Sequence, residues 1–189
     1  RRAQIDYNLM ENNWQQAQAG VAILLTVRNQ YGGCLQCVVE DVTFEYNVVR
    51  NVAAGINILG IDPNYPSEQT NAIRIRHNEF SGLDRTAWGG NGYFLQLGNN
   101  PRDITIDHNT IISPNGLGIV TVTGAPVYGF VFTNNVARHN SYGIFGDALS
   151  YGNTAIAYYF PDIVMRRNVL AGGKASLYPA DNLFPTVTS

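Results

Sequence analysis

The chain has 189 residues, of which 45% are apolar and 14% charged, and its formal net charge is −2. This length and composition suffice for one domain, residues 1–189, with a continuous apolar core. The slightly acidic balance argues against nucleic acid and anionic membrane surfaces as partners. No stretch approaches the ~18 consecutive apolar residues that a membrane-spanning helix needs, so no membrane span is predicted.

Six segments share one pattern, in which apolar residues stand five and three positions before an asparagine and two positions after it. They lie at residues 3–10, 42–49, 73–80, 104–111, 130–137 and 163–170. The alternation of apolar and polar residues predicts a β-strand before each asparagine rather than a helix. Because the pattern recurs every 26 to 39 residues, it indicates a stack of similar coils.

A second pattern is a glycine that leads into a short apolar run. It occurs at Gly20, Gly55, Gly92, Gly118 and Gly143. Each coil is therefore expected to contain two strands separated by a turn, with loops of variable length elsewhere. The predicted fold is all-β, a single-stranded parallel β-helix of about six coils.

Stacking the coils places the six asparagines in one column, about 4.8 Å apart. The column consists of Asn8, Asn47, Asn78, Asn109, Asn135 and Asn168. Each side-chain amide can then donate to the side-chain carbonyl of its neighbour, which satisfies the buried polar groups of the turn. We expect this asparagine ladder to be structural rather than catalytic.

The rungs Ile73-Arg74-Ile75-Arg76-His77-Asn78-Glu79-Phe80 and Ile104-Thr105-Ile106-Asp107-His108-Asn109-Thr110-Ile111 carry a resemblance to a known group. They resemble those of right-handed parallel β-helix proteins of the pectate-lyase-like superfamily, and the resemblance extends from residue 3 to about residue 172. It implies a right-handed helix and a function in carbohydrate chemistry. That superfamily also includes hydrolases, epimerases, phage tailspikes and adhesins, so the fold does not select one activity.

The first predicted strand starts almost at residue 1, and no amphipathic helix is available to cover the first coil. Solenoids need capped ends. The chain is therefore expected to be a fragment of a longer β-helix protein, or to associate end to end through uncapped coils. The C-x-x-C motif of Cys34 and Cys37 lacks the further ligands of a zinc site and is interpreted as a local disulfide or as two free thiols.

Outward positions on successive coils form a second column, two residues before the ladder asparagines. Glu45, Arg76 and Asp107 stand there on three consecutive coils. The two carboxylates would be about 9.5 Å apart, at the upper end of the range for an inverting glycosidase, although an ion-pair ladder is the simpler interpretation. His77 and His108, just before ladder asparagines, should stack on each other and are interpreted mainly as turn packing.

The strand after each glycine, with its flanking loops, is the predicted functional surface. Insertions at 60–69, 81–91 and 146–153 emerge beside it. Aromatic faces and amides suit a sugar ring, which offers an apolar face and hydroxyl groups. The predicted substrate-binding residues are Asn57, Tyr65, Trp88, Phe94, Gln96 and Phe145. Aromatic residues that fold back over the sheet remain the structural alternative.

Within this surface Asp62, Asp84 and Asp147 are the candidate general acids or bases, and Arg76 completes the candidate catalytic set because the lyases of the resembled superfamily use an arginine. Those lyases also bind calcium through clustered aspartates, and this chain shows no such cluster. No metal site and no cofactor are therefore predicted, calcium being the one ion that the resemblance implies. No G-x-S-x-G, phosphate-loop or H-E-x-x-H motif is present.

Three functions remain open. The leading expectation is a secreted polysaccharide lyase or glycoside hydrolase, which needs two convergent acids in the groove. The first alternative is a non-catalytic module that binds a polysaccharide or oligosaccharide through exposed aromatic side chains. The second alternative is a structural or fibre-forming solenoid unit. A single lysine among 189 residues and 21 asparagines suit an extracellular or periplasmic protein.

Overall fold

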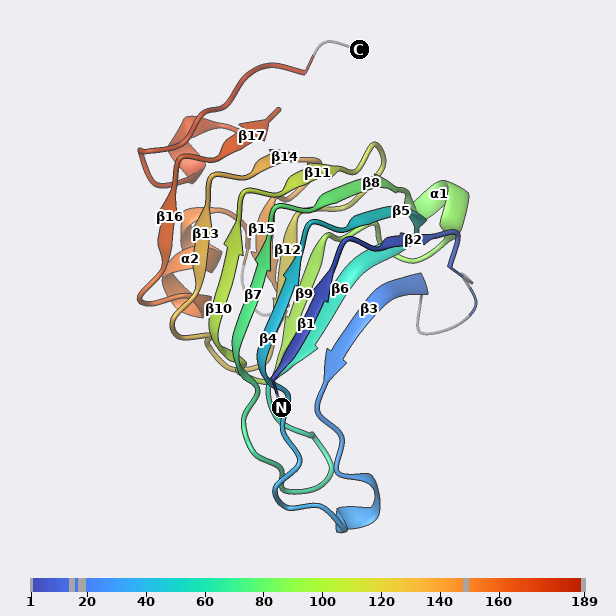
Figure 1. Ribbon diagram of the computed structural model, residues 1–189. Helices are drawn as coiled ribbons and strands as arrows, with labels where there is room; N and C mark the ends of the chain where they lie inside the picture. Colours follow the sequence, from blue (N-terminus) through green and yellow to red (C-terminus); the bar gives the residue numbers. More distant parts are fainter. Residues whose placement is uncertain (1, 14–15, 17–19, 148–149, 188–189) are drawn as a thin grey trace.

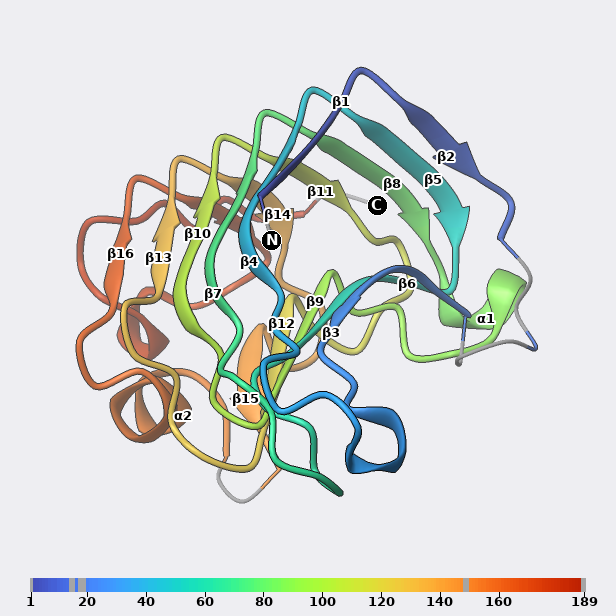
Figure 2. The ribbon, with the colours of Figure 1, turned by 60° about the horizontal axis from the view of Figure 1, so that its bottom comes forward.

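The computed structural model describes residues 2–13, 16, 20–147 and 150–187. Its strands form three parallel sheets around one axis (Figures 1 and 2). Sheet A contains β1 (Ala3–Asp6), β4 (Glu40–Glu45), β7 (Asn71–Arg76), β10 (Arg102–Asp107), β13 (Val131–Thr133) and β16 (Val164–Arg166). The strands are stacked in chain order, one from each coil, so the predicted single-stranded parallel β-helix is confirmed.

Sheet B follows the asparagine turn of each coil. It contains β2 (Leu9–Glu11), β5 (Val48–Val52), β8 (Glu79–Leu83), β11 (Thr110–Ile112), β14 (Val136–Arg138) and β17 (Val169–Ala171). Sheet C is formed by β3 (Val21–Thr26), β6 (Ala54–Leu59), β9 (Leu95–Gly98), β12 (Val120–Thr123) and β15 (Ile144–Gly146). The sequence patterns predicted two strands per coil, whereas the first five coils have three; the additional strand is that of sheet B, which begins within the asparagine pattern.

In the part of the chain that the structure describes, short α-helices and 3₁₀ turns interrupt the coils. Helix α1 (Arg85–Trp88) follows β8, and α2 (Asn153–Tyr159) packs beside β15. The 3₁₀ turns span Gln30–Gly32 and Ala175–Leu177. None of the helices in the described part of the chain is long and apolar enough to cross a membrane.

Alternation along the strands produces the core. Ile75 of β7 pairs in register with Phe44 and Ile106, and all three side chains point inward and are buried. The intervening residues of these strands point to solvent. Every second residue of these strands therefore points to the interior and is apolar.

The asparagine ladder is confirmed and has one more member than the sequence pattern predicted. The Oδ1 atom of Asn109 accepts from the backbone N–H of Asn78 at 3.1 Å and from its Nδ2 at 3.0 Å. The same pair of bonds recurs along the column and ends at Asn182, whose Oδ1 accepts from Asn168 at 3.0 and 2.8 Å. Asn182 comes from the C-terminal segment, which pairs beside β17 through Leu183.

The residue before each of the six predicted ladder asparagines adopts a left-handed backbone conformation. These residues are Tyr7, Tyr46, His77, His108, Asn134 and Arg167, with φ between 52° and 57°. Residues other than Gly and Asn rarely adopt this backbone conformation. We infer that the hydrogen bonds of the ladder hold it in place. The ring centroids of His77 and His108 lie 5.0 Å apart, so the two rings are neighbours as predicted, but their planes are tilted by 31° rather than stacked.

Candidate functional site

The three candidate acids lie in different parts of the molecule. Asp62 belongs to the loop after β6, Asp84 precedes α1, and Asp147 follows β15. In Figure 1 these elements lie at the bottom, the upper right and the rear left of the helix. No cavity found in the described residues is lined by two of these three carboxylates.

Asp62 organises its own loop. Its carboxylate accepts backbone N–H groups of Asn64 and Asn29, both at 2.8 Å, and of Tyr65 at 3.3 Å. These bonds hold the pKa of Asp62 below its usual value, because they stabilise the ionised form. A general acid needs the opposite shift, so the environment favours a structural carboxylate.

Asp84 is the N-cap of α1. One carboxylate oxygen accepts the backbone N–H groups of Ala87 at 3.0 Å and Thr86 at 2.7 Å. The side chain of Asn115 approaches the same oxygen at 3.4 Å. These bonds lower the pKa of Asp84, with that from Ala87 contributing most. Sequence reasoning overlooked the Asp at the start of a short helix, which is a known capping signal.

Asp147 is exposed, and its carboxylate connects two elements. It accepts from the hydroxyl group of Tyr159, the last residue of α2, at 2.6 Å, and from the backbone N–H of Gly124 at 3.3 Å. Tyr159 is fully buried. Asp147 therefore fastens α2 and the loop after β12 to the end of β15.

Arg76 is engaged in the ion-pair ladder. Its Nε lies 2.6 Å from Oε2 of the buried Glu45. Asp107, on the next coil, instead accepts from Thr133 at 2.6 Å and from Asn134 at 2.7 Å, and it contacts His108 at 2.7 Å. The expected ion-pair ladder is therefore present for Glu45 and Arg76 only, and Asp107 binds side chains of the following coil and His108 instead.

Among the predicted binding residues, Asn57, Gln96 and Phe145 do share one row. The outer face of sheet C carries, on consecutive coils, Leu24, Asn57, Gln96, Thr121 and Phe145. The side-chain amide of Asn57 donates to that of Gln96 at 3.5 Å. This row is the part of the predicted surface that the fold assembles.

The prediction that Phe94 binds substrate is wrong, because its side chain is fully buried. It precedes β9, where the chain is still turning from sheet B into sheet C. Its ring packs edge-on against Phe80, with the centroids 4.8 Å apart. Asn57, two residues after Gly55, pairs in register with Gln96, which is four residues after Gly92. The number of residues between the glycine and the outward-facing position therefore differs between coils.

Tyr65 and Trp88 lie away from this row. Tyr65 lines a cavity of about 320 Å³ in the loops at the bottom of Figure 1, together with Arg28, Tyr31 and Asp62. Trp88 ends α1 and is half-buried. The predicted binding residues are therefore divided among four locations: the row on sheet C, the core, the loop cavity and the end of α1.

An aromatic cluster that sequence reasoning did not assemble surrounds Phe145. Its ring lies 5.4 Å from that of Tyr142 and 5.5 Å from that of Tyr93, and Tyr142 lies 6.0 Å from Tyr151. The bridge between Phe145 and Tyr151 folds the loop after β15 back on the strand. Tyr142, Phe145 and Tyr151 line a cavity of about 420 Å³.

Gly118 makes room for this cluster. A Cβ atom at this position would lie 2.7 Å from Cε1 of Phe145, closer than real contacts allow. The ring therefore lies over the backbone of the preceding coil. Residues 146–147 and 150–153 of the insertion 146–153 are described, since residues 148–149 lie outside the described part of the chain.

Other chemical groups are sparse. Among residues 2–13, 16, 20–147 and 150–187, no group of three or more His, Cys, Asp and Glu side chains is placed to hold a metal ion. Cys34 and Cys37 form a disulfide, as one of the two interpretations of their motif expected. The same loop is fixed by the backbone N–H of Cys34, which donates to Oδ1 of Asn29 at 2.6 Å.

The fold defines the class: the chain is a parallel β-helix protein with a buried asparagine ladder. No family model matches the sequence, and the comparisons with curated proteins and with solved structures found no match. Fold and local geometry are therefore the basis for a functional proposal.

Proposed function

We propose that this protein binds a carbohydrate through the outer face of sheet C and does so without cleaving it. The observation that carries the proposal is the cluster of Tyr93, Tyr142, Phe145 and Tyr151 at the end of a row of polar side chains. Tyr142 and Tyr151 are 42% and 39% exposed, so a ligand can reach them. Their cavity is of the size that suits a small ligand or one sugar unit.

The chemistry of this surface fits a saccharide. A pyranose ring has an apolar face that stacks on tyrosine or phenylalanine, and its hydroxyl groups both donate and accept hydrogen bonds. The side-chain amides of Asn57 and Gln96 can both donate and accept hydrogen bonds. They lie in the same row as Phe145, with Thr121 between Phe145 and Gln96, on strands about 4.8 Å apart. An extended oligosaccharide lying across the coils would contact both parts.

Binding is favoured over cleavage by the state of the carboxylates. Asp62 and Asp84 accept hydrogen bonds from backbone N–H groups, and both have a lowered pKa. Asp147 holds Tyr159. Glycoside hydrolysis needs two carboxyl groups within about 10 Å, one of them kept protonated, and nothing in these environments favours that pairing.

The location that we propose is extracellular or periplasmic. Disulfides persist in oxidising compartments, and Cys34 and Cys37 are joined in this protein. A polysaccharide ligand would be encountered there. Self-association remains part of the proposal through the strands β1, β2 and β3, because each is the outermost strand of its sheet.

The test is a panel of neutral and acidic polysaccharides, with binding measured by calorimetry and cleavage by reducing ends and ultraviolet absorbance. We expect binding without product. Tyr142→Ala and Tyr151→Ala should each weaken it about tenfold, the effect of losing one stacking contact of about 1.4 kcal/mol. Tyr128→Ala is the matched control, since Tyr128 is 46% exposed and packs against Arg102 instead.

Two results would refute the proposal. One is product release from any polymer, which would restore the lyase or hydrolase hypothesis. The other is binding that is equally affected by the Tyr128 variant and the two cluster variants, because the aromatic cluster would then not be the site.

A further inference from the structure

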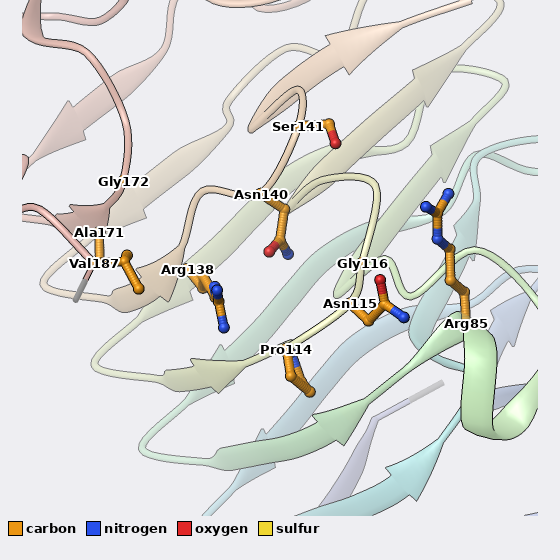
Figure 3. Close-up of a pocket in the computed structure, with 10 residues that line it drawn as sticks. All are labelled: Arg85, Pro114, Asn115, Gly116, Arg138, Asn140, Ser141, Ala171, Gly172 and Val187. Carbon is orange, nitrogen blue, oxygen red and sulfur yellow. The ribbon is translucent and has the colours of Figure 1, made fainter. Parts of the chain in front are cut away.

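A separate pocket beside the aromatic cluster is rich in positive charge and hydrogen-bond donors (Figure 3). It has a volume of about 340 Å³. Arg85 and Arg138 stand at opposite sides of it, with Asn115, Gly116 and Asn140 between them. No described residue that lines it is an aspartate or a glutamate.

Four successive coils and the C-terminal segment line this pocket, and three of those coils supply its polar side chains. Arg85 is the first residue of α1, which follows β8, while Asn115 and Gly116 lie in the loop after β11. Arg138 ends β14, and Asn140 follows it. Because β8, β11 and β14 are neighbours in sheet B, the three loops emerge side by side, although they are far apart in the sequence.

The two arginines have no ion-pair partner among the described residues, in contrast to Arg2, Arg50, Arg74 and Arg76. The nearest candidate, Asp84, adjoins Arg85 in the chain, but its bonds go to Thr86, Ala87 and Asn115. Guanidinium groups bind carboxylate, sulfate and phosphate oxygens with paired hydrogen bonds. Two unpaired guanidinium groups facing one cavity therefore favour an anion.

Asn140 supplies an independent observation. Its Nδ2 is buried and has no hydrogen-bond partner in the described structure. Buried donors are almost always satisfied, so an orphaned one favours an additional acceptor. Because the Nδ2 atom is enclosed, an acceptor in the cavity reaches it after a rotation of the Asn140 side chain. At Gly116 a Cβ would lie 3.0 Å from this Nδ2 and 2.3 Å from Oγ of Ser113, so any side chain there would crowd the amide.

We propose that this pocket binds an anionic group, a sulfate, phosphate or carboxylate, held by Arg85, Arg138 and the side-chain amide of Asn140. The cavity is larger than a free inorganic anion needs, which favours a ligand of about one sugar ring that carries the charge. The site does not require the carbohydrate surface proposed above. The turn between Arg138 and Gly143 nevertheless separates the two, with Asn140 on the anion side and Tyr142 on the aromatic side.

The experiment is a titration of the ¹⁵N-labelled protein, monitored by the side-chain amide signals of Asn140 and the Nε–H signals of the arginines. The probes are inorganic sulfate, inorganic phosphate, glucose 6-sulfate, glucose 6-phosphate and glucuronate, with glucose as the neutral control. We expect the anionic probes to shift the Asn140 signal and glucose to leave it unchanged. Sugar-borne anions should bind more tightly than the inorganic ions; equal affinity would keep the anion site and identify a free ion as its ligand.

Variants assign the effect to the pocket. Arg85→Gln and Arg138→Gln should each weaken binding about tenfold, because each removes a charge-assisted contact. Arg166→Gln is the matched control, since Arg166 is exposed on sheet A and should bind like the parent. Tyr142→Ala should also leave the inorganic anions unaffected, which separates this site from the carbohydrate surface.

The proposal is overturned if no anionic probe shifts the Asn140 signal. It is also overturned if Arg166→Gln weakens binding as much as the two pocket variants, since general electrostatic attraction would then explain the shifts. Asn140→Asp gives a further check that keeps the shape of the side chain. It places a carboxylate among the arginines and should abolish anion binding while the circular dichroism spectrum stays unchanged.

Discussion

The carboxylates of Asp62 and Asp84 accept hydrogen bonds from the backbone of their own loops. Asp84 caps α1 and reaches Asn115 on the next coil, and Asp62 gathers three backbone N–H groups. In both cases a short loop would otherwise leave donors unsatisfied. Acidic residues in β-helix loops are therefore candidates for capping before they are candidates for catalysis.

The first prediction concerns this cap. We expect Asp84→Ala to lower the free energy of unfolding by about 1 kcal/mol, because Thr86 and Ala87 lose their acceptor. Asp84→Asn should cost less, since asparagine also caps helices. Urea unfolding of both variants measures the effect. Equal losses in the two variants would show that the charge, and not the cap, supplies the stability.

His139 is buried, and the second prediction follows from its protonation. Burial lowers the pKa of His139, although the bond from its Nδ1 to the carbonyl of Asn140 opposes the shift. Its Nε2 lies 2.7 Å from the hydroxyl group of Tyr178, whose pKa burial raises to about 12. The neutral imidazole therefore accepts from that hydroxyl at Nε2 in the folded state.

The unfolded chain binds a proton at His139 more readily than the folded one. The free energy of unfolding should therefore rise with pH between the folded and the unfolded pKa of His139. The contribution of His139 to the free energy of unfolding should be fully present above the unfolded pKa of about 6.5. Below that pH the free energy of unfolding should fall by up to about 1.4 kcal/mol per pH unit. Urea unfolding between pH 5 and pH 8 checks this. His139→Gln should remove the dependence, and His77→Gln, at an exposed histidine, should retain it; the opposite result contradicts the assignment.

At the scale of the element, the asparagine ladder sets the turn between sheets A and B. Asn109 both accepts from Asn78 and donates to the carbonyl groups of Ile75 and Asp107 and to Asn135. The left-handed residue before it would be strained without these bonds. Each rung thus depends on the rungs on either side.

The third prediction compares a central rung with the terminal one. Asn109→Ala should lower the free energy of unfolding by about 3 kcal/mol, because several buried groups of adjacent coils lose their partners. Asn8→Ala should cost less than about 1 kcal/mol, since Asn8 is exposed and water can replace its bonds. Urea unfolding measures both values, and similar losses would contradict the ladder as the source of stability.

At the scale of the whole molecule, the two ends of the helix differ. The N-terminal coil presents Leu9 and Leu24, which are 56% and 43% exposed. At the other end the segment around Leu183 pairs with the last coil: the backbone N–H of Leu170 donates to Leu183 and that of Gly172 to Pro185, both at 2.8 Å. A solenoid edge that is covered in this way opens less readily.

The fourth prediction is a gradient of amide hydrogen exchange along the axis. Strands β1, β2 and β3 should exchange fastest, the central β7 and β8 slowest, and β17 more slowly than β2. Mass spectrometry of peptic fragments measures this order. Asn182→Ala should accelerate exchange in β17 and leave β1 to β3 unchanged; equal exchange at both ends of the parent protein would contradict the cap.

Periodic features were predictable from the sequence, and irregular ones were not. The six asparagines and their flanking apolar residues predicted the fold and the ladder, because stacking repeats the same local environment in every coil. Asn182 escaped the pattern, since it completes the ladder from a segment without a rung. Phe94 was misplaced because the distance from the glycine to the strand varies between coils.

The candidate sites depend on which loops are neighbours in space, and the sequence alone does not reveal this. Tyr93, Tyr142 and Tyr151 become one cluster, and Arg85 and Arg138 one pocket, only when coils about 30 to 50 residues apart are stacked in register. The sequence by itself determined the repeat, the buried asparagines and the parallel coils, because these follow from local alternation and spacing. Only the tertiary structure decided which charges are paired, since pairing depends on distances between loops of different coils.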